Sequence, residues 1–340
     1  MSDRFSSPQV RDLGEQGLLE RLQRFCPADV VGDDAAVIPG PDFGQALVVT
    51  TDVLVDGVHF SDLTTSPQDA GWRAVAANLS DLAAMGASPL GITVGLAITG
   101  DVAVSWVLAL YQGISDCLKQ YNTTLVGGDI CRSPVISLSI TAFGQVSPNR
   151  TIKRTAAKVG DAIVVTGIHG ASRTGLELLL NPELGENLTV AERTLLILAH
   201  QRPRPRLDVL PILWNILVDA SSCLRVAGMD SSDGLADAVL QLCRASGVGA
   251  TIERSRIPLP PVLNQLASSE QVWDWVLYGG EDFELVLCLP PEPAEALVKQ
   301  LGESAAVIGH IAPGNEVWLR DSTGAYGDEV LKLSRGFQHF

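Results

Sequence analysis

Aspartate and glutamate residues recur in short motifs that could hold cations around a phosphate. The motifs are GDDAA (32–36), TTD (50–52), NLSD (78–81), GGD (127–129), DSSDG (230–234) and GGED (279–282). Any single Gly-Asp pair is explained equally well by a turn with an Asx hydrogen bond. Carboxylates gathered in one cleft, however, would repel one another and lose hydration unless cations neutralised them. Mg²⁺ prefers carboxylate, hydroxyl and phosphate oxygens and therefore fits this residue set.

Other metal and phosphate chemistries lack their usual motifs. The 5 histidines never come within helical-pair spacing, and no cysteine lies near one in a zinc-ligand pattern. No lysine follows a glycine, so the chain has no GxxxxGK[ST] phosphate loop, and it has no lysine motif of the protein-kinase type. The stretch GASRTG (170–175) differs from the GxSxG elbow of α/β-hydrolases. A bound phosphate would therefore be held through hard cations.

The stretch LVVTTDVLVDGVHF (47–60) joins a strand-like apolar run to hydroxyls, two carboxylates and His59. A single histidine is as often a hydrogen-bonded structural residue as a substrate contact. Its charge changes near neutral pH, which suits it to contact a substrate. The residues around it favour substrate contact.

Composition limits the classes of protein. A chain of 340 residues with 46% hydrophobic content can fill two cores. The net charge of −15 disfavours nucleic acid, whose binding needs clustered basic residues. The 6 cysteines form no CxxC, and the N-terminus lacks a signal pattern, so we expect a reduced, cytoplasmic protein. The stretch PLGITVGLAITG is too short to span a bilayer and reads as a core strand, so we expect no membrane segment.

Apolar spacing predicts the elements that position these residues. Residues 66–86 form a helix with Ser66 as its cap, Pro67 in its first turn and Gly86 beyond its end, and Asp81 lies off its apolar face. A second helix is expected near 104–121. Strands are expected at 46–51, 123–127, 135–145, 162–167 and 284–289. The alternation predicts α/β (or α+β) layers, with a domain boundary in the polar stretch 147–161 that separates residues 1–150 from residues 151–340.

Several long motifs together resemble one family. They are GDDAAV, TTDVLVDGVHF, NLSDLAAMGASP, LVGGD, SSDGLADA, YGGEDFEL and the terminal GFQHF. In this order, from about residue 30 to the last residue, they resemble the thiamine-monophosphate kinases, whose superfamily includes aminoimidazole ribonucleotide synthetase.

The resemblance implies direct in-line transfer of the γ-phosphoryl group of ATP onto thiamine monophosphate, which gives thiamine diphosphate. It implies a homodimer formed through the N-terminal sheets. Residues 1–150 would be a mixed sheet with helices that binds ATP and several Mg²⁺ ions, and K⁺ is a further candidate cation. Residues 151–340 would be an α/β domain of the aminoimidazole ribonucleotide synthetase type that completes the substrate site. Partners would be the two substrates, without nucleic acid or membrane.

The resemblance also implies a role for each matching residue. The metal ligands would be Asp34, Thr50, Thr51, Asp52, Asp81, Asp129, Asp230 and Asp233. The nucleotide would be bound by Gly128, Asp129, Arg154 and Ser232, and the thiamine phosphate by His59, Glu281 and Phe337. The catalytic set would be Asp52, Asp81, Asp129 and Arg154. For Phe337, a terminal core anchor and an aromatic ring stacked on thiamine are both compatible with the sequence.

Competing members of the superfamily would carry different cysteines. A hydrogenase-maturation dehydratase would end in a cysteine, whereas this chain ends in GFQHF. A selenophosphate synthetase would have a reactive N-terminal cysteine with a lysine close by, and Cys26 has no such lysine. A catalytically silent nucleotide-binding regulator would tolerate lost ligands, yet all the matching carboxylates are present. Ile130 and Cys131 replace the usual Thr-Thr pair and remove one hydroxyl contact, and Ser231 replaces an apolar residue.

Overall fold

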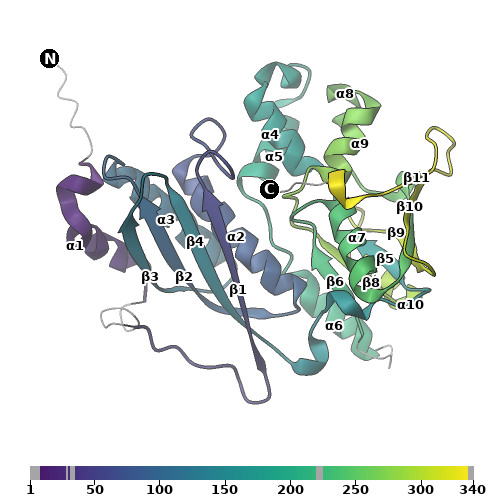
Figure 1. Ribbon diagram of the computed structural model, residues 1–340, viewed down its shortest axis with the longest axis horizontal. Helices are drawn as coiled ribbons and strands as arrows, with labels where there is room; N and C mark the ends of the chain where they lie inside the picture. Colours follow the sequence, from purple (N-terminus) through teal and green to yellow (C-terminus); the bar gives the residue numbers. More distant parts are fainter. Residues whose placement is uncertain (1–7, 28–29, 31–34, 220–224, 336–340) are drawn as a thin grey trace. The chain divides into compact units, whose positions relative to one another are not determined.

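The computed structural model describes residues 8–27, 30, 35–219 and 225–335. The chain divides into two compact units. The first comprises Met1–Leu82 and Ser88–Gln145, and the second comprises Ala83–Ala87 and Val146–Phe340. Each unit is a mixed β-sheet layered with helices (Figure 1), which confirms the predicted α/β class.

The first unit is built on a four-stranded sheet in the order β1-β4-β2-β3. The strands are β1 (Ala46–Val55), β2 (Ser88–Ile98), β3 (Leu125–Arg132) and β4 (Ser137–Val146). The helices are α1 (Val10–Leu22), α2 (Pro67–Ala84) and α3 (Val104–Gln120), and a short 3₁₀ turn, η1 (Gln23–Phe25), follows α1. β2 pairs with β3 in parallel and with β4 in antiparallel orientation.

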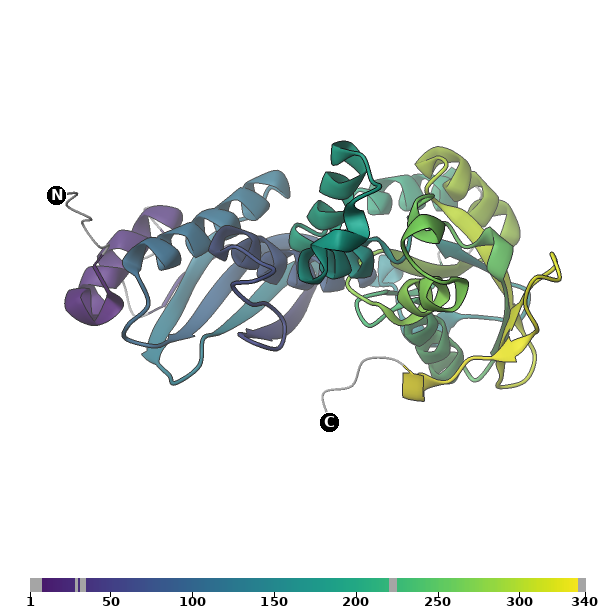
Figure 2. The same ribbon diagram turned by 90° about the horizontal axis from the view of Figure 1, so that it is seen from above.

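One face of this sheet is covered and the other is open. Burial alternates strictly along β4, because successive side chains point to opposite faces of a strand. The covered face packs against α2 and α3, and α3 runs along it in Figures 1 and 2. On the other face, β1 exposes Leu47, Val49 and Val53, with 54%, 53% and 49% of each residue accessible. These three apolar side chains share the open face with exposed Thr51 of the same strand, and exposed apolar side chains gathered on one strand are uncommon for a surface in contact with water.

The second unit contains a seven-stranded sheet in the order β11-β10-β7-β9-β5-β8-β6. The strands are β5 (Ala162–Val165), β6 (Ala227–Asp230), β7 (Gly249–Glu253), β8 (Leu285–Leu289), β9 (Ala306–Ala312), β10 (Val317–Arg320) and β11 (Glu329–Val330). The helices are α4 (Ala171–Leu180), α5 (Val190–Gln201), α6 (Val209–Asp219), α7 (Leu235–Ser246), α8 (Leu263–Leu266), α9 (Ser269–Tyr278) and α10 (Pro291–Leu301). The 3₁₀ turns are η2 (Pro148–Arg150), η3 (Arg154–Ala156), η4 (Pro182–Gly185), η5 (Arg254–Arg256) and η6 (Leu333–Arg335).

Helices cover both faces of this second sheet. α7 and α9 pack with Ile163 and Val165 of β5 in one apolar core. α6 and α10 pack with Ala162 and Val164 of the same strand in another. All four residues of β5 are buried, as expected for a strand covered on both sides. A smaller cluster joins α4 to α5.

The structure confirms the predicted helices and strands, but their first and last residues differ from the predicted ones. Both helices and all five strands occur, and PLGITVGLAITG contains most of β2. β1 continues four residues beyond the predicted end, because Thr51 and Asp52 keep the alternation of the strand. β3 runs through Gly128, where a Cβ atom would lie only 2.1 Å from the carbonyl oxygen of Val94. Glycine therefore permits close strand pairing here. Within the described ranges, no helix combines the length and the apolar character that crossing a bilayer requires.

Candidate active site

Two carboxylates and a hydroxyl belong to one side of the first unit's sheet. Thr50 and Asp52 are two residues apart on β1, so their side chains share a face. The Thr50 hydroxyl donates a hydrogen bond to Oδ2 of Asp81, which α2 presents from the covered face. The structure thus brings Thr50 to Asp81, with Asp52 next along the same face. All three provide only oxygen ligands, as a hard cation requires.

Thr51 and Asp129 belong to the opposite face of the same sheet. Oγ1 of Thr51 lies 2.8 Å from Oγ1 of Thr141, and Thr141 is paired with Thr93 across the sheet. Two residues beyond Thr93 on β2, Gly95 is paired with Asp129 of β3. Side chains of paired residues share a face, so the Asp129 carboxylate lies on the face opposite to the Thr50 and Asp81 side chains. Within this unit, the sheet separates the predicted ligands into two groups.

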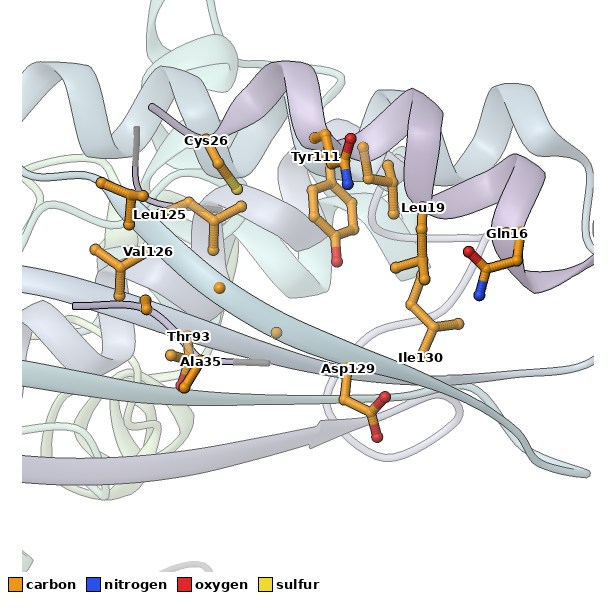
Figure 3. Close-up of a pocket in the computed structure, with 16 residues that line it drawn as sticks. Gln16, Leu19, Cys26, Ala35, Thr93, Tyr111, Leu125, Val126, Asp129 and Ile130 are labelled. Atoms are coloured by element: carbon orange, nitrogen blue, oxygen red, sulfur yellow. The ribbon is translucent and has the colours of Figure 1, made fainter. Parts of the chain in front are cut away.

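A cavity of about 890 Å³ lies between α1, η1 and β3 in the first unit. Figure 3 shows Leu19 of α1 and Tyr111 of α3 on one side and Val126 of β3 on the other. Gly128 and Asp129 also line it, and the Asp129 carboxylate is turned away from the Tyr111 ring (Figure 3). Its volume is typical of a small-molecule site, and its lining combines apolar and polar side chains. Cys26 lines the cavity too, and burial raises the pKa of its thiol, which opposes a reactive thiolate.

His59 lies in the turn that follows β1. Its Nδ1 accepts a hydrogen bond from the backbone N–H of Val55 at 3.0 Å. The neutral ring therefore carries its proton on Nε2, and the ring orientation is fixed by the backbone. Arg73 of α2 donates to the carbonyl oxygen of His59 at 3.5 Å and supports the same turn. His59 is thus a hydrogen-bonded residue, and this role is compatible with substrate contact through the other nitrogen.

The second unit holds four of the predicted residues near the start of α7. Asp230 ends β6 and is buried, and it accepts a hydrogen bond from the Ser232 hydroxyl at 3.0 Å. Burial and the neighbouring Asp233 raise the pKa of Asp237, and Arg154 opposes that shift. Arg154 and Asp233 therefore both act electrostatically on the first turn of α7. The structure brings these four residues to one end of this helix.

Glu281 lies in a tight loop between α9 and β8. Its backbone N–H donates to the carbonyl oxygen of Ser232 at 2.7 Å, which joins the GGED and DSSDG motifs. The next residue, Asp282, accepts hydrogen bonds from the backbone N–H groups of Gly170 and Ser172 at 2.7 and 2.9 Å, at the start of α4. Burial raises the pKa of Asp282 to about 7, although these two donors oppose the shift. Two acidic motifs that are far apart in the sequence thus meet in one unit.

Sequence reasoning missed three residues around Glu281, which are Ser172, His200 and Asp282. The GGED motif contains Asp282 and could have indicated it. His200 and Ser172 carry no local signal, since only the packing of α5 on α4 brings them together. Oγ of Ser172 lies 3.3 Å from Nδ1 of His200.

Two predicted residues, Asp34 and Phe337, lie outside the described residues. Among the residues that the structure describes, no group of three or more His, Cys, Asp or Glu side chains is arranged around a possible metal position. The group of Thr50, Asp52 and Asp81 contains only two such side chains, together with a hydroxyl, and therefore falls below that number.

Comparisons with known proteins identify the family. Residues 32–146 match the AIR synthase related protein, N-terminal domain, and residues 158–321 match the C-terminal domain of the same family. The thiamine-monophosphate kinase of Synechococcus elongatus is 56% identical, over 100% of this chain and 99% of that protein.

Two solved structures extend the likeness to the fold. The thiamine-monophosphate kinase of Stenotrophomonas maltophilia is 33% identical with a TM-score of 0.77, over 89% of this chain and 95% of that chain. AaThiL complexed with AMPPCP and TMP is 30% identical with a TM-score of 0.72, over 98% and 99% of the two chains. Both likenesses span both units, and the sequence identity extends from end to end. The chain therefore belongs to the thiamine-monophosphate kinase family, within the AIR synthase related proteins.

Proposed function

We propose that the protein transfers the γ-phosphoryl group of ATP onto thiamine monophosphate and forms thiamine diphosphate. The observation that carries this proposal is the 56% identity to a thiamine-monophosphate kinase over the whole chain. The related AaThiL is complexed with both AMPPCP and TMP, which supports the same pair of substrates here.

Mg²⁺ fits the donors that the first unit offers. Thr50, Asp52 and Asp81 would bind it together with phosphate oxygens. Thr51 and Asp129, which lie on the opposite face of the sheet, and Asp34 would bind further ions of the nucleotide site. In the second unit, Asp230 and Asp233 would hold a further ion, for which K⁺ is also a candidate. A divalent ion held by these residues would neutralise phosphate charge.

The cavity beside β3 supports nucleotide binding in the first unit. Its apolar wall of Leu19, Tyr111 and Val126 suits a flat base, and Gly128 leaves the backbone accessible. Asp129 lines the cavity and would meet the nucleotide through its backbone, because its carboxylate is turned away from the Tyr111 ring. In the second unit, Arg154 would pair with phosphate oxygens through its planar guanidinium, and Ser232 would contact the nucleotide.

The acceptor needs no dedicated general base. A phosphate monoester is already largely ionised near neutral pH, because its second pKa is about 6. The protein therefore has to bring two phosphates into line and neutralise their charge. His59, Glu281 and Phe337 would bind the thiamine phosphate and orient it for direct transfer.

The open face of the first unit's sheet supports homodimer formation. Leu47, Val49 and Val53 expose apolar side chains on one face of β1, on which Thr51 lies between Val49 and Val53, and a second copy would remove these side chains from water. Five cysteines in the described ranges are free, which suits the reducing cytoplasm. The cysteines are Cys26, Cys117, Cys131, Cys243 and Cys288.

The proposal is tested by incubating the purified protein with ATP, Mg²⁺ and thiamine monophosphate and separating the products by chromatography. We expect thiamine diphosphate and ADP in equal amounts, no thiamine diphosphate after chelation of the metal, and no reaction when thiamine replaces its monophosphate. ADP and inorganic phosphate without thiamine diphosphate would contradict the proposal.

A further inference from the structure

The loop that presents Glu281 has a strained backbone. Glu281 has a φ angle of 59° and Phe283 one of 51°, in the left-handed region that side chains other than glycine rarely adopt. Gly280 precedes them with a φ of 67°, and a Cβ atom there would lie 2.7 Å from the carbonyl oxygen of Ser232. Such strain persists only where the surroundings determine the conformation, and it concentrates at functional sites.

Contacts made by the three residues after Glu281 help to determine this conformation. The Asp282 carboxylate caps the first turn of α4 through two backbone N–H groups. Phe283 is buried, and Glu284 accepts hydrogen bonds from Thr166 at 2.6 Å and Arg206 at 2.5 Å. The backbone of the loop is therefore anchored immediately after Glu281.

A second anchor reaches the Glu281 side chain from α5. Nδ1 of His200 lies 3.7 Å from Oε2 of Glu281 and 3.3 Å from Oγ of Ser172. His200 is 3% exposed, whereas the Glu281 side chain is 34% exposed. His200 is thus fixed inside the unit, whereas the Glu281 side chain faces the solvent from which a substrate arrives.

A close approach of two helices makes this contact available. A Cβ atom on Gly175 of α4 would lie 2.0 Å from the carbonyl oxygen of Leu196 and 3.1 Å from Cβ of His200. Glycine at this position lets α5 come close enough for His200 to lie beside Ser172. Since Ser172 also donates its backbone N–H to Asp282, the contacts Glu281–His200–Ser172–Asp282 form a closed ring.

We propose that His200 and Asp282 are positioning residues that hold the Glu281 carboxylate in the orientation needed to bind thiamine monophosphate. Asp282 fixes the backbone of Glu281 against α4, and His200 fixes its side chain through Nδ1. Neither residue touches the substrate. This inference rests on the proposed function and on the assignment of Glu281 to the substrate side.

The test compares the Michaelis constants of His200→Ala, His200→Asn and Asp282→Asn for both substrates. We expect His200→Ala to raise the KM for thiamine monophosphate about 2- to 5-fold, the upper range for the loss of a partly exposed ion pair. The KM for ATP and kcat should change less than about twofold, which is within the variation of unrelated surface variants. His200→Asn, whose amide can replace Nδ1–H, should recover part of the affinity, and Asp282→Asn should also raise this KM selectively.

His310→Asn is the matched control, because His310 is an exposed histidine of β9 in the same unit. It should leave both KM values unchanged. Thermal unfolding of every variant distinguishes positioning from folding. If His200→Ala lowered the melting temperature while both KM values stayed at the wild-type level, His200 would be only a structural residue and the inference would be wrong.

A double mutant tests whether the effect passes through Glu281. We expect Glu281→Gln to raise the KM for thiamine monophosphate, and His200→Ala to add little in that background. The inference would be overturned if the double mutant raised the KM for thiamine monophosphate by the product of the two single-variant factors. It would also be overturned if Glu281→Gln left this KM unchanged. Thiamine diphosphate formation by the unmodified protein remains a separate readout, so failure of the inference is distinguishable from failure of the proposed function.

Discussion

At the scale of single residues, the hydrogen bond from Thr50 to Asp81 links the strand that carries TTD to the helix that carries NLSD. A carboxylate offers about four lone-pair sites on its two oxygens, so a threonine hydroxyl that donates to one of them does not exclude a cation. The family resemblance predicted a ligand role for both residues but not that they touch, because their contact depends on how α2 crosses the sheet.

We predict that Asp81→Asn lowers kcat by about two to four orders of magnitude, because it removes a charge needed beside the transferred phosphate. The melting temperature should change little, since Asp81 lies off the apolar face of α2. Asp101→Asn is the control, as Asp101 is an exposed carboxylate in the same unit. Equal kcat values for Asp81→Asn and the wild type would assign Asp81 to a purely structural bond with Thr50.

The half-buried Asp282 gives a prediction for stability against pH. Its pKa is about 7 in the folded protein and 3.8 as the ordinary value for the unfolded chain, so the folded state retains a proton that the unfolded state releases. Its contribution to the free energy of unfolding therefore falls as the pH rises through that window, by on the order of 2–4 kcal/mol.

Chemical denaturation of the wild type and of Asp282→Asn across this window isolates the effect. The difference in unfolding free energy, wild type minus variant, should decrease as the pH rises, because asparagine does not titrate. A difference that is constant with pH would show that Asp282 is ionised throughout and that its two N–H donors outweigh burial.

At the scale of elements, the approach of α4 and α5 at Gly175 has a measurable consequence. Because a Cβ atom there would overlap the carbonyl oxygen of Leu196, we predict that Gly175→Ala destabilises the protein by about 1–3 kcal/mol. It should also raise the KM for thiamine monophosphate, since His200 would move with α5. Gly327→Ala is the control, because nothing lies within 4 Å of its added Cβ atom. If Gly175→Ala left the free energy of unfolding unchanged, α4 and α5 would move apart without loss of stability, and this prediction would be wrong.

The spacing of apolar residues correctly predicted the helices and strands that are covered on one face only. The helix at 66–86 and the strand at 135–145 were found because each has one covered face, and its apolar residues follow a single period. The end of β1 was missed because polar ligands continue a strand that propensity would stop. The loop after α9 could not be predicted, since its left-handed residues are maintained by contacts with α4 and with Ser232, in the turn between β6 and α7, which lie 110 and 49 residues away.

At the scale of the whole molecule, the open face of β1 predicts the oligomeric state. Val49→Arg should turn a dimer into a monomer, because an arginine in an apolar interface leaves its charge unpaired. Analytical ultracentrifugation of the wild type and the variant measures this. Val159→Arg is the control, as Val159 is an exposed valine in the second unit. A wild-type protein that sediments as a monomer would contradict the proposed role of this face.

The central claim is direct, cation-assisted transfer from ATP to thiamine monophosphate, and the stereochemistry at phosphorus tests it most directly. ATP made chiral at its γ-phosphorus with oxygen isotopes would be turned over with Mg²⁺ and thiamine monophosphate, and the terminal phosphate of the product would be analysed. We predict that the labelled phosphoryl group appears in thiamine diphosphate with inverted configuration, because a single in-line displacement inverts phosphorus. Retained configuration, which requires a phosphorylated protein intermediate, or label found only in inorganic phosphate would contradict this account.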